Sequence, residues 1–194
     1  RPARRAWRTV VAEQPEVLED VTVIDGAIYA QLLHDAANRI VRFDMDGTRR
    51  DELPIPAMHS ASIRGDGPGH AVLTVESFAA PETSWRVDVA TGARTVERAA
   101  EIPYDGSNVD VRYGAATSKD GTRVPYFVVW PKGASADGHN PTLLYGYGGF
   151  EVPLQPQYSG GFGSAWYGRS GVQVVANIRG GGGFGPGWHQ AALK

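Results

Sequence analysis

The chain has 194 residues, of which 42% are hydrophobic and 21% charged, with 25 glycines, 13 prolines and no cysteine. A chain of this length forms one large domain or two small ones, and abundant glycine and proline favour a turn-rich β or α/β fold over a helical bundle. The absence of cysteine excludes disulfides, thiolate nucleophiles and cysteine-bound zinc. The formal net charge is −2, and the sequence has no basic stripe typical of nucleic-acid binding. It also has no apolar run of the roughly 18 residues that span a bilayer.

The first 110 residues predict short antiparallel strands, which are rich in valine and isoleucine and separated by Asp-Gly and Thr-Gly turns. Within this part Ile40–Gly47 resembles Ser84–Gly92, and Arg42 precedes Arg86 by 44 residues. A repeat of this length with four short strands per unit is the pattern of β-propeller blades; two unrelated hairpins with shared turn chemistry are the alternative. Two blades cannot close a propeller, so we expect most of it to precede Arg1. The expected strands are Trp7–Val11, Val21–Asp25, Ala27–Leu33, Arg39–Asp44, Ala71–Ser77, Trp85–Val89 and Arg94–Arg98.

The rest of the chain predicts the start of an α/β domain whose sheet changes from antiparallel to parallel. A hairpin with an Asp-Gly turn is followed by a short apolar run, which we expect to be a buried strand. A glycine-rich turn, one helix, the strongest strand of the chain, a second glycine run and a helix that opens with proline complete the pattern. These elements are the hairpin strands Val111–Thr117 and Arg123–Trp130, the strand Pro141–Tyr145, the helix near Gly163–Arg169, the strand Val172–Ile178 and the helix from Pro186.

The second glycine run formally matches a dinucleotide-binding motif. Gly180, Gly182 and Gly185 satisfy G-x-G-x-x-G after a strand. In a run of four glycines such a match is weak, and Pro186 removes a backbone N–H that a phosphate would need. The histidines have neither an H-x-x-x-H pair nor carboxylates at ligand spacing, so we expect surface or hydrogen-bonded roles and no metal site. They are His34, His59, His70, His139 and His189.

Serine hydrolysis is the third chemistry to consider. A nucleophile elbow requires G-x-S-x-G on a strand-to-helix turn, whereas Gly168–Val172 (GRSGV) ends in valine and precedes a strand, so no residue present is a credible nucleophile. Gly146–Phe150 (GYGGF) nevertheless follows a strand where α/β-hydrolases place the oxyanion loop. The Tyr147 hydroxyl could donate a hydrogen bond to a developing oxyanion. A tight glycine turn whose aromatic residues merely pack is the alternative.

Several segments together resemble the prolyl oligopeptidase family. Pro141–Phe150 (PTLLYGYGGF) and Val175–Gly182 (VANIRGGG) are similar to the start of that family's catalytic domain. Thr117–Pro125 is similar to its entry hairpin, and the first hundred or so residues, including Leu18–Val21, are similar to its last propeller blades. The resemblance covers nearly the whole chain and is most specific in the second half.

The resemblance implies a fold in two parts: residues 1–110 as the last blades of a seven-bladed β-propeller, and residues 111–194 as the N-terminal part of an α/β-hydrolase catalytic domain. It implies a serine-type oligopeptidase that cleaves short peptides after proline and needs no cofactor or metal. Its partner is a proline-containing oligopeptide, with no nucleic acid and no membrane. Tyr147 matches the family's oxyanion-stabilising tyrosine, and Phe150 matches an aromatic residue that lines the pocket for the substrate proline ring. The family's Ser-Asp-His triad is expected beyond Lys194, so the 194 residues alone are expected to be inactive.

Two alternatives to this function stay open. A peptidase of oligopeptidase B type would have broader or basic-residue specificity, against which Phe150 is the single argument in the sequence. A propeller-based binding module with a degenerate hydrolase domain would lack the nucleophile altogether. We expect a cytoplasmic location, with a periplasmic one as the alternative, and the sequence leaves the oligomeric state open.

Overall fold

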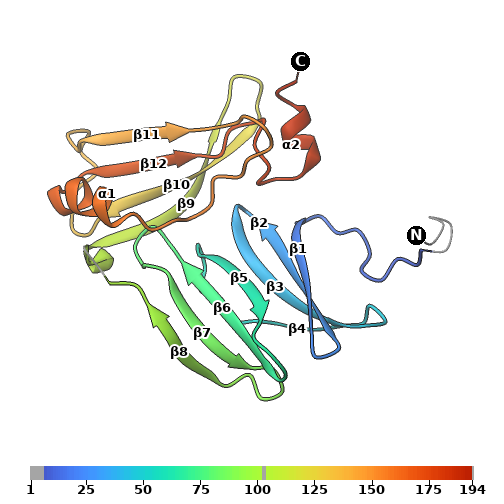
Figure 1. Cartoon of the computed structure of the whole chain (residues 1–194). Coiled ribbons are helices and arrows are strands. Elements are labelled where there is room, and N and C mark those ends of the chain that lie inside the picture. The colour runs from blue at the N-terminus through green and yellow to red at the C-terminus, as the bar shows by residue number, and fades with distance from the viewer. Residues whose placement is uncertain (1–6, 102–103, 194) are drawn as a thin grey trace.

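The computed structural model describes residues 7–101 and 104–193 and consists largely of three four-stranded sheets. Figure 1 shows two of them side by side, with the third packed across their ends. The strands up to residue 99 build the first two sheets, and those from residue 109 build the third. None of the helices within the described ranges is long and apolar enough to cross a membrane.

The first two sheets repeat one plan, in which four consecutive strands pair antiparallel in sequence order, as in a propeller blade. The two repeated sequence segments overlap β3 and β7, the third strands of the two sheets, so the predicted repeat of blades is confirmed. The fourth strand of each blade is exposed along its whole length. The strands are β1 (Val17–Ile24), β2 (Ala27–His34), β3 (Ala37–Asp44) and β4 (Arg49–Glu52), then β5 (Ser60–Gly65), β6 (His70–Glu76), β7 (Thr83–Asp88) and β8 (Arg94–Ala99).

The two blades pack against each other through side chains that alternate along the strands. Ile24, Tyr29 and Ile40 of the first blade share one buried cluster with Ile63 and Leu73 of the second. This cluster gives the pair of blades a common apolar core.

A polar contact also joins the blades at the end that faces the third sheet. Asn38 is buried, and its Oδ1 accepts a hydrogen bond from the Ala61 N–H at 2.9 Å. Its Nδ2 donates to Glu19 at 2.5 Å, and Glu19 in turn accepts from Gln155 at 2.6 Å. Burial raises the pKa of the Glu19 carboxyl above its usual value, although the two amide donors oppose this effect. The network therefore connects both blades to the segment that follows the first glycine turn.

The third sheet has the order β11-β12-β10-β9. A 3₁₀ turn, η2 (Gly106–Asn108), leads into the predicted hairpin of β9 (Val109–Thr117) and β10 (Arg123–Pro131). The strand β12 (Val172–Ala176) pairs antiparallel with β10 and parallel with β11 (Thr142–Gly146), so the predicted change of strand direction is confirmed. The expected domain boundary at 110/111 falls just inside β9, and the division itself stays a prediction.

The helical segments of this part are short. The connection between β11 and β12 contains α1 (Gly160–Ala165) and the 3₁₀ turn η3 (Tyr167–Arg169), and α2 (Pro186–Gln190) follows β12. The buried Tyr167 packs in one cluster with Phe127 of β10, Val175 of β12 and Phe78, which follows β6. The third sheet and the second blade thus share a core.

Some expected elements are corrected by the structure. Trp7–Val11 forms no strand. Val10 and Val11 contribute side chains to the apolar cluster on one face of β2 and β3, and their backbone joins no sheet. The strand expected at Pro141–Tyr145 is β11, and it is exposed along its whole length because it is the edge strand of the sheet within the described residues. The helix expected near Gly163–Arg169 ends at Ala165 and continues as the 3₁₀ turn η3.

Two strands of the blades were not predicted. The strand β4 has the sequence RRDE, and ion pairs hold it to β3: Arg42 to Asp51 at 2.6 Å and Arg39 to Glu52 at 2.5 Å. Edge strands commonly carry charged residues in place of alternating apolar ones, so apolar periodicity does not reveal β4. The short β5 has only two inward apolar residues, Ala61 and Ile63.

Candidate functional site

Two glycine-rich turns meet at one edge of the third sheet (Figure 1). The parallel strands β11 and β12 are paired in register, with Gly146 opposite Ala176 at their carboxyl ends. The first turn, residues 146–150, follows β11, and the second turn, residues 179–185, follows β12 shortly afterwards. Ligands bind at the carboxyl edge of such sheets in many α/β proteins. The sequence positions that the family resemblance singles out therefore lie where a site is expected.

The two turns pack backbone against backbone. A Cβ atom on Gly148 would lie 2.2 Å from the carbonyl oxygen of Arg179, and one on Gly180 would lie 2.0 Å from the carbonyl oxygen of Gly148. Gly180 also has φ +99°, a conformation that residues with a side chain rarely adopt. The Glu151 N–H donates to the Gly180 carbonyl at 3.2 Å. Because neither turn can shift without moving the other, they act as one rigid unit, which we call the paired glycine turns.

Both candidate site residues lie on the first turn. Tyr147 is 36% exposed, and its hydroxyl lies over Gly149, where an added Cβ atom would be only 2.7 Å away. Phe150 is 90% exposed and has φ +54°, followed by Glu151 with φ +59°. Two successive side-chain-bearing residues in the left-handed region cost conformational energy, and such strain clusters at functional sites. The turn thus presents a phenol and an aromatic ring that remain accessible to a ligand.

The second turn is held from behind by α2. The Gly180 N–H donates to the Trp188 carbonyl at 2.9 Å, and His189 donates from Nδ1 to the Gly180 carbonyl at 2.8 Å. The Trp188 indole N–H donates to the Ile178 carbonyl at 3.1 Å. Pro186 occupies the first turn of α2, as predicted.

A charged contact ties the second turn to the β9–β10 hairpin. The Arg179 guanidinium forms an ion pair with Asp120, which lies in the hairpin turn. This guanidinium, together with hydrogen bonds from Thr122, holds the pKa of the Asp120 carboxyl well below its usual range. Fifty-nine residues separate the two partners, and no local pattern in the sequence signals the contact.

One buried polar group at this edge is unsatisfied. Asn177 directly follows β12 and is 4% exposed, and its Nδ2 atom has no hydrogen-bond partner within the described residues. Its backbone N–H donates to the Pro125 carbonyl at 2.9 Å. Buried donors are normally paired, and Asn177 leaves one side-chain donor without a partner among the described residues, next to the second turn.

The other chemistries considered from the sequence find no support at this edge. In the supposed dinucleotide motif the Gly180 N–H already donates to the Trp188 carbonyl. A Cβ atom on Gly182 would lie 2.1 Å from the Glu151 carbonyl oxygen, and the helix α2 that follows has only five residues. The run therefore packs on the first turn and offers no open phosphate cradle. Ser170 lies in the tight turn before β12, not on a strand-to-helix elbow. Within the described ranges, no group of three His, Asp or Glu side chains is placed to hold a metal ion.

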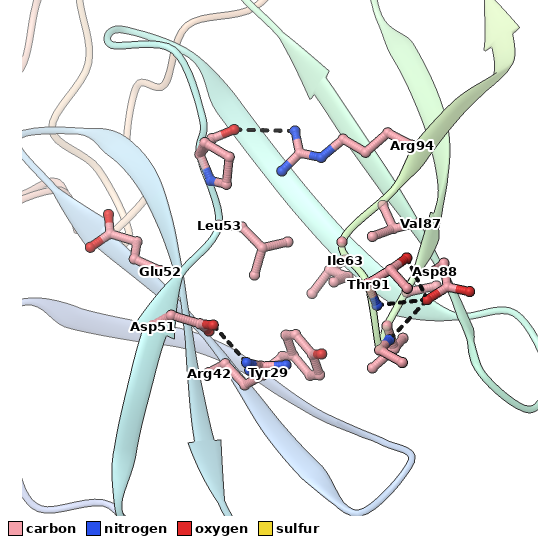
Figure 2. Close-up of a pocket in the computed structure, with 15 residues that line it drawn as sticks. Tyr29, Arg42, Asp51, Glu52, Leu53, Ile63, Val87, Asp88, Thr91 and Arg94 are labelled. Carbon is pink, nitrogen blue, oxygen red and sulfur yellow. Dashed lines mark hydrogen bonds and ion pairs between the residues drawn. The ribbon is translucent and has the colours of Figure 1, made fainter.

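A recess of about 350 Å³ lies between the two blades, and none of its lining residues belongs to the paired glycine turns. Figure 2 shows Arg42 paired with Asp51, Asp88 accepting hydrogen bonds from the turn that follows it, and Arg94 donating to the Pro54 carbonyl. Glu52, which also lines the recess, pairs with Arg39. These contacts brace the outer edges of the blades. The paired glycine turns are therefore the better candidate site.

Comparisons with known proteins agree with this arrangement. Residues 1–100 match the family model described as the N-terminal β-propeller domain of prolyl oligopeptidase. A prolyl endopeptidase of Elizabethkingia meningoseptica is 32% identical over 160 residues, covering 81% of this chain and 23% of that protein. A solved structure from a study of two prolyl endopeptidases and their inter-domain dynamics superimposes with a TM-score of 0.91 at 33% identity, covering 98% of this chain and 28% of that one.

A peptide-bound structure is also similar. Prolyl oligopeptidase B from Galerina marginata, bound to a 25-residue macrocyclization substrate, has a TM-score of 0.84 and 27% identity, covering 95% of this chain and 26% of that one. The chain therefore spans about a quarter of the length of the relatives it matches. The roles of Tyr147 and Phe150 are not addressed by these likenesses and stay predictions.

Proposed function

The chain belongs to the prolyl oligopeptidase family, and from this membership we propose that the natural protein containing it is a serine peptidase that cleaves short peptides on the carboxyl side of proline. The similarity to prolyl endopeptidases supports the reaction class. The similarity to an oligopeptidase bound to a peptide substrate supports peptides as the partner. The attacking serine and its histidine are assigned to no residue of this chain, whose contribution is to bind substrate and stabilise charge.

Tyr147 is the proposed donor to the oxyanion. During attack on a peptide bond the carbonyl oxygen gains negative charge, and a donor aimed at that position stabilises the transition state more than the substrate. The donor must be held in place before the reaction, because any reorganisation would add to the barrier. The observation that carries the proposal is the close contact of Gly148 with Arg179 and of Gly180 with Gly148, which fixes the turn that bears Tyr147.

Phe150 is the proposed contact for the proline ring of the substrate. Its side chain is 90% exposed although it is large and apolar, and its left-handed backbone directs it away from the core. Contact with a proline ring would remove apolar surface from water on both molecules. Because this contact exists before and during the reaction, it contributes to substrate binding more than to the chemical step.

The experiment is a substrate panel on the purified natural protein. Chromogenic peptides that differ only in the residue before the scissile bond, which is proline, alanine or arginine, are compared by kcat/KM. Proline is expected to be preferred by at least about 10-fold, since filling a fitted apolar pocket is worth that much. A serine-directed sulfonyl fluoride should abolish the activity.

The same panel separates the alternatives. A preference for arginine would favour the oligopeptidase B type of specificity and contradict the proposal. Absence of hydrolysis with all three peptides would favour a binding module. The 194 residues expressed alone should turn over none of the peptides, because an oxyanion donor cannot by itself attack a carbonyl; turnover that survives further purification would contradict this part of the proposal.

A further inference from the structure

We propose that the Asp120–Arg179 ion pair is a positioning device, which holds the paired glycine turns so that Tyr147 is aimed at the oxyanion. The inference rests on the proposed function, because it assigns to these residues a task that they perform through Tyr147. It adds two positioning residues, contributed by the β9–β10 hairpin and by the second turn.

The anchor is a rigid hairpin turn. The Ser118 N–H donates to the Thr122 carbonyl at 2.8 Å, and the Gly121 N–H donates to the Ser118 carbonyl at 2.9 Å. Asp120 Oδ1 accepts from the Thr122 N–H at 3.1 Å, which leaves Oδ2 for the Arg179 guanidinium. Arg179 Nη1 also donates to the Thr122 hydroxyl at 3.3 Å. The guanidinium is therefore gripped by two side chains of one hydrogen-bonded turn.

The backbone of Arg179, whose side chain is held in this way, contacts the first turn. Its carbonyl oxygen lies against the Cα atom of Gly148, the residue after Tyr147. The next residue, Gly180, packs on the Gly148 carbonyl and accepts the Glu151 N–H. Any displacement of Arg179 therefore acts directly on the segment that carries the hydroxyl. The path from Asp120 to Tyr147 consists of one ion pair and one backbone contact.

The charge on Asp120 persists under ordinary conditions. Its pKa lies well below the usual value, chiefly because of Arg179, so the carboxylate stays ionised throughout the neutral range. Both side chains are partly exposed, and pairs of this kind contribute little to global stability. A structural role alone would predict a small change in melting temperature and no selective effect on catalysis. A positioning role predicts a fall in kcat that exceeds any rise in KM.

The test uses the purified natural protein and the best peptide of the panel. Asp120→Asn keeps the size of the side chain and the acceptor for Thr122 but removes the charge that holds Arg179. We expect kcat to fall about 10-fold and KM to rise less than kcat falls, since a displacement of 1 Å can cost up to 10²-fold. Asp120→Glu should recover part of the loss. Lys119→Gln, which removes a charge from the same exposed turn, should leave kcat unchanged.

The decisive comparison is made in the Tyr147→Phe background. If Asp120 acts through the tyrosine hydroxyl, Asp120→Asn should lower kcat no further once that hydroxyl is gone. An equal fall in both backgrounds, or none in the wild type, would overturn the positioning role. If Tyr147→Phe itself retains wild-type kcat, the proposed function of Tyr147 fails instead, so the two failures are distinguishable.

Amide hydrogen exchange gives a readout that does not depend on activity. Asp120→Asn should speed exchange in residues 147–151, where the Glu151 N–H is bonded to Gly180, and leave the protection of β12 unchanged. Unchanged exchange in residues 147–151 would contradict the inference even if no peptide is hydrolysed.

Discussion

Gly148→Ala probes the contact on which the account of the site depends. The added Cβ would lie 2.2 Å from the Arg179 carbonyl oxygen and 2.9 Å from Ile178 Cγ1, whereas real Cβ atoms essentially never approach closer than 3.0 Å. The two turns must therefore separate by nearly 1 Å. Gly148 does not have a positive φ, so the effect is steric and not one of backbone conformation. Overpacking of this kind costs about 2 kcal/mol, and a displacement of about 1 Å lowers kcat by up to 10²-fold.

The assay combines denaturant unfolding with steady-state kinetics of the natural protein. Gly161→Ala is the matched control, because Gly161 is exposed in α1 and an added Cβ would meet no atom within 4 Å. Alanine is favoured over glycine in a helix by up to about 1 kcal/mol, so the control should be unchanged or slightly more stable. If Gly148→Ala retained both the stability and the kcat of the wild type, the two turns would not be interlocked.

Three further substitutions test other parts of the structure. Asn38→Ala should lower the free energy of unfolding by about 1–3 kcal/mol, because it leaves the buried Ala61 N–H without its acceptor; an unchanged denaturation midpoint would contradict the link between the blades. The pKa of Glu19 is higher in the folded than in the unfolded protein. Its contribution to stability is therefore present below the unfolded pKa and should be lost as the pH rises through the folded pKa. Melting curves of Glu19→Gln between pH ~4 and ~7 should lack this decline. Phe150→Ala should raise KM more than it lowers kcat, because the proposed contact with the proline ring exists before and during the reaction; a selective loss of kcat would argue against that contact.

The blades were predictable because short, local sequence patterns determine their strands and turns. Turn pairs such as Asp46-Gly47 and the alternation around Ile40 recur with the period of a blade, and strand pairing follows sequence order. The strand β4 escaped prediction because its four charged residues are held by ion pairs to β3, which a pattern of apolar residues does not register. The exposure of Leu144 on β11 was not predicted, because an apolar run indicates a strand but not whether that strand lies at the edge of a sheet.

The glycine-rich turn that carries the candidate site residues was predictable, but its packing was not. The glycine turn around Tyr147 could be located from its place after a strand and from the family resemblance. The packing of Gly148 on Arg179 and the ion pair of Arg179 with Asp120 join segments that are 31 and 59 residues apart in the sequence. The first contact follows from the register of the parallel strands β11 and β12, and the second from the antiparallel pairing of β12 with β10. No single segment of the sequence specifies either pairing.

Replacing Tyr147 by Phe isolates the proposed oxyanion donor, because it removes the hydroxyl and keeps the ring over Gly149. Tyr145→Phe, which deletes the hydroxyl of the half-exposed Tyr145 in β11, is the matched control. With a proline-containing peptide, kcat of the Tyr147 variant should fall by roughly 10²–10³, or about 2.7–4 kcal/mol, with little change in KM and an unchanged melting temperature. A Tyr147→Phe protein that retains wild-type kcat would show that the hydroxyl stabilises no oxyanion and that Tyr147 is a packing residue.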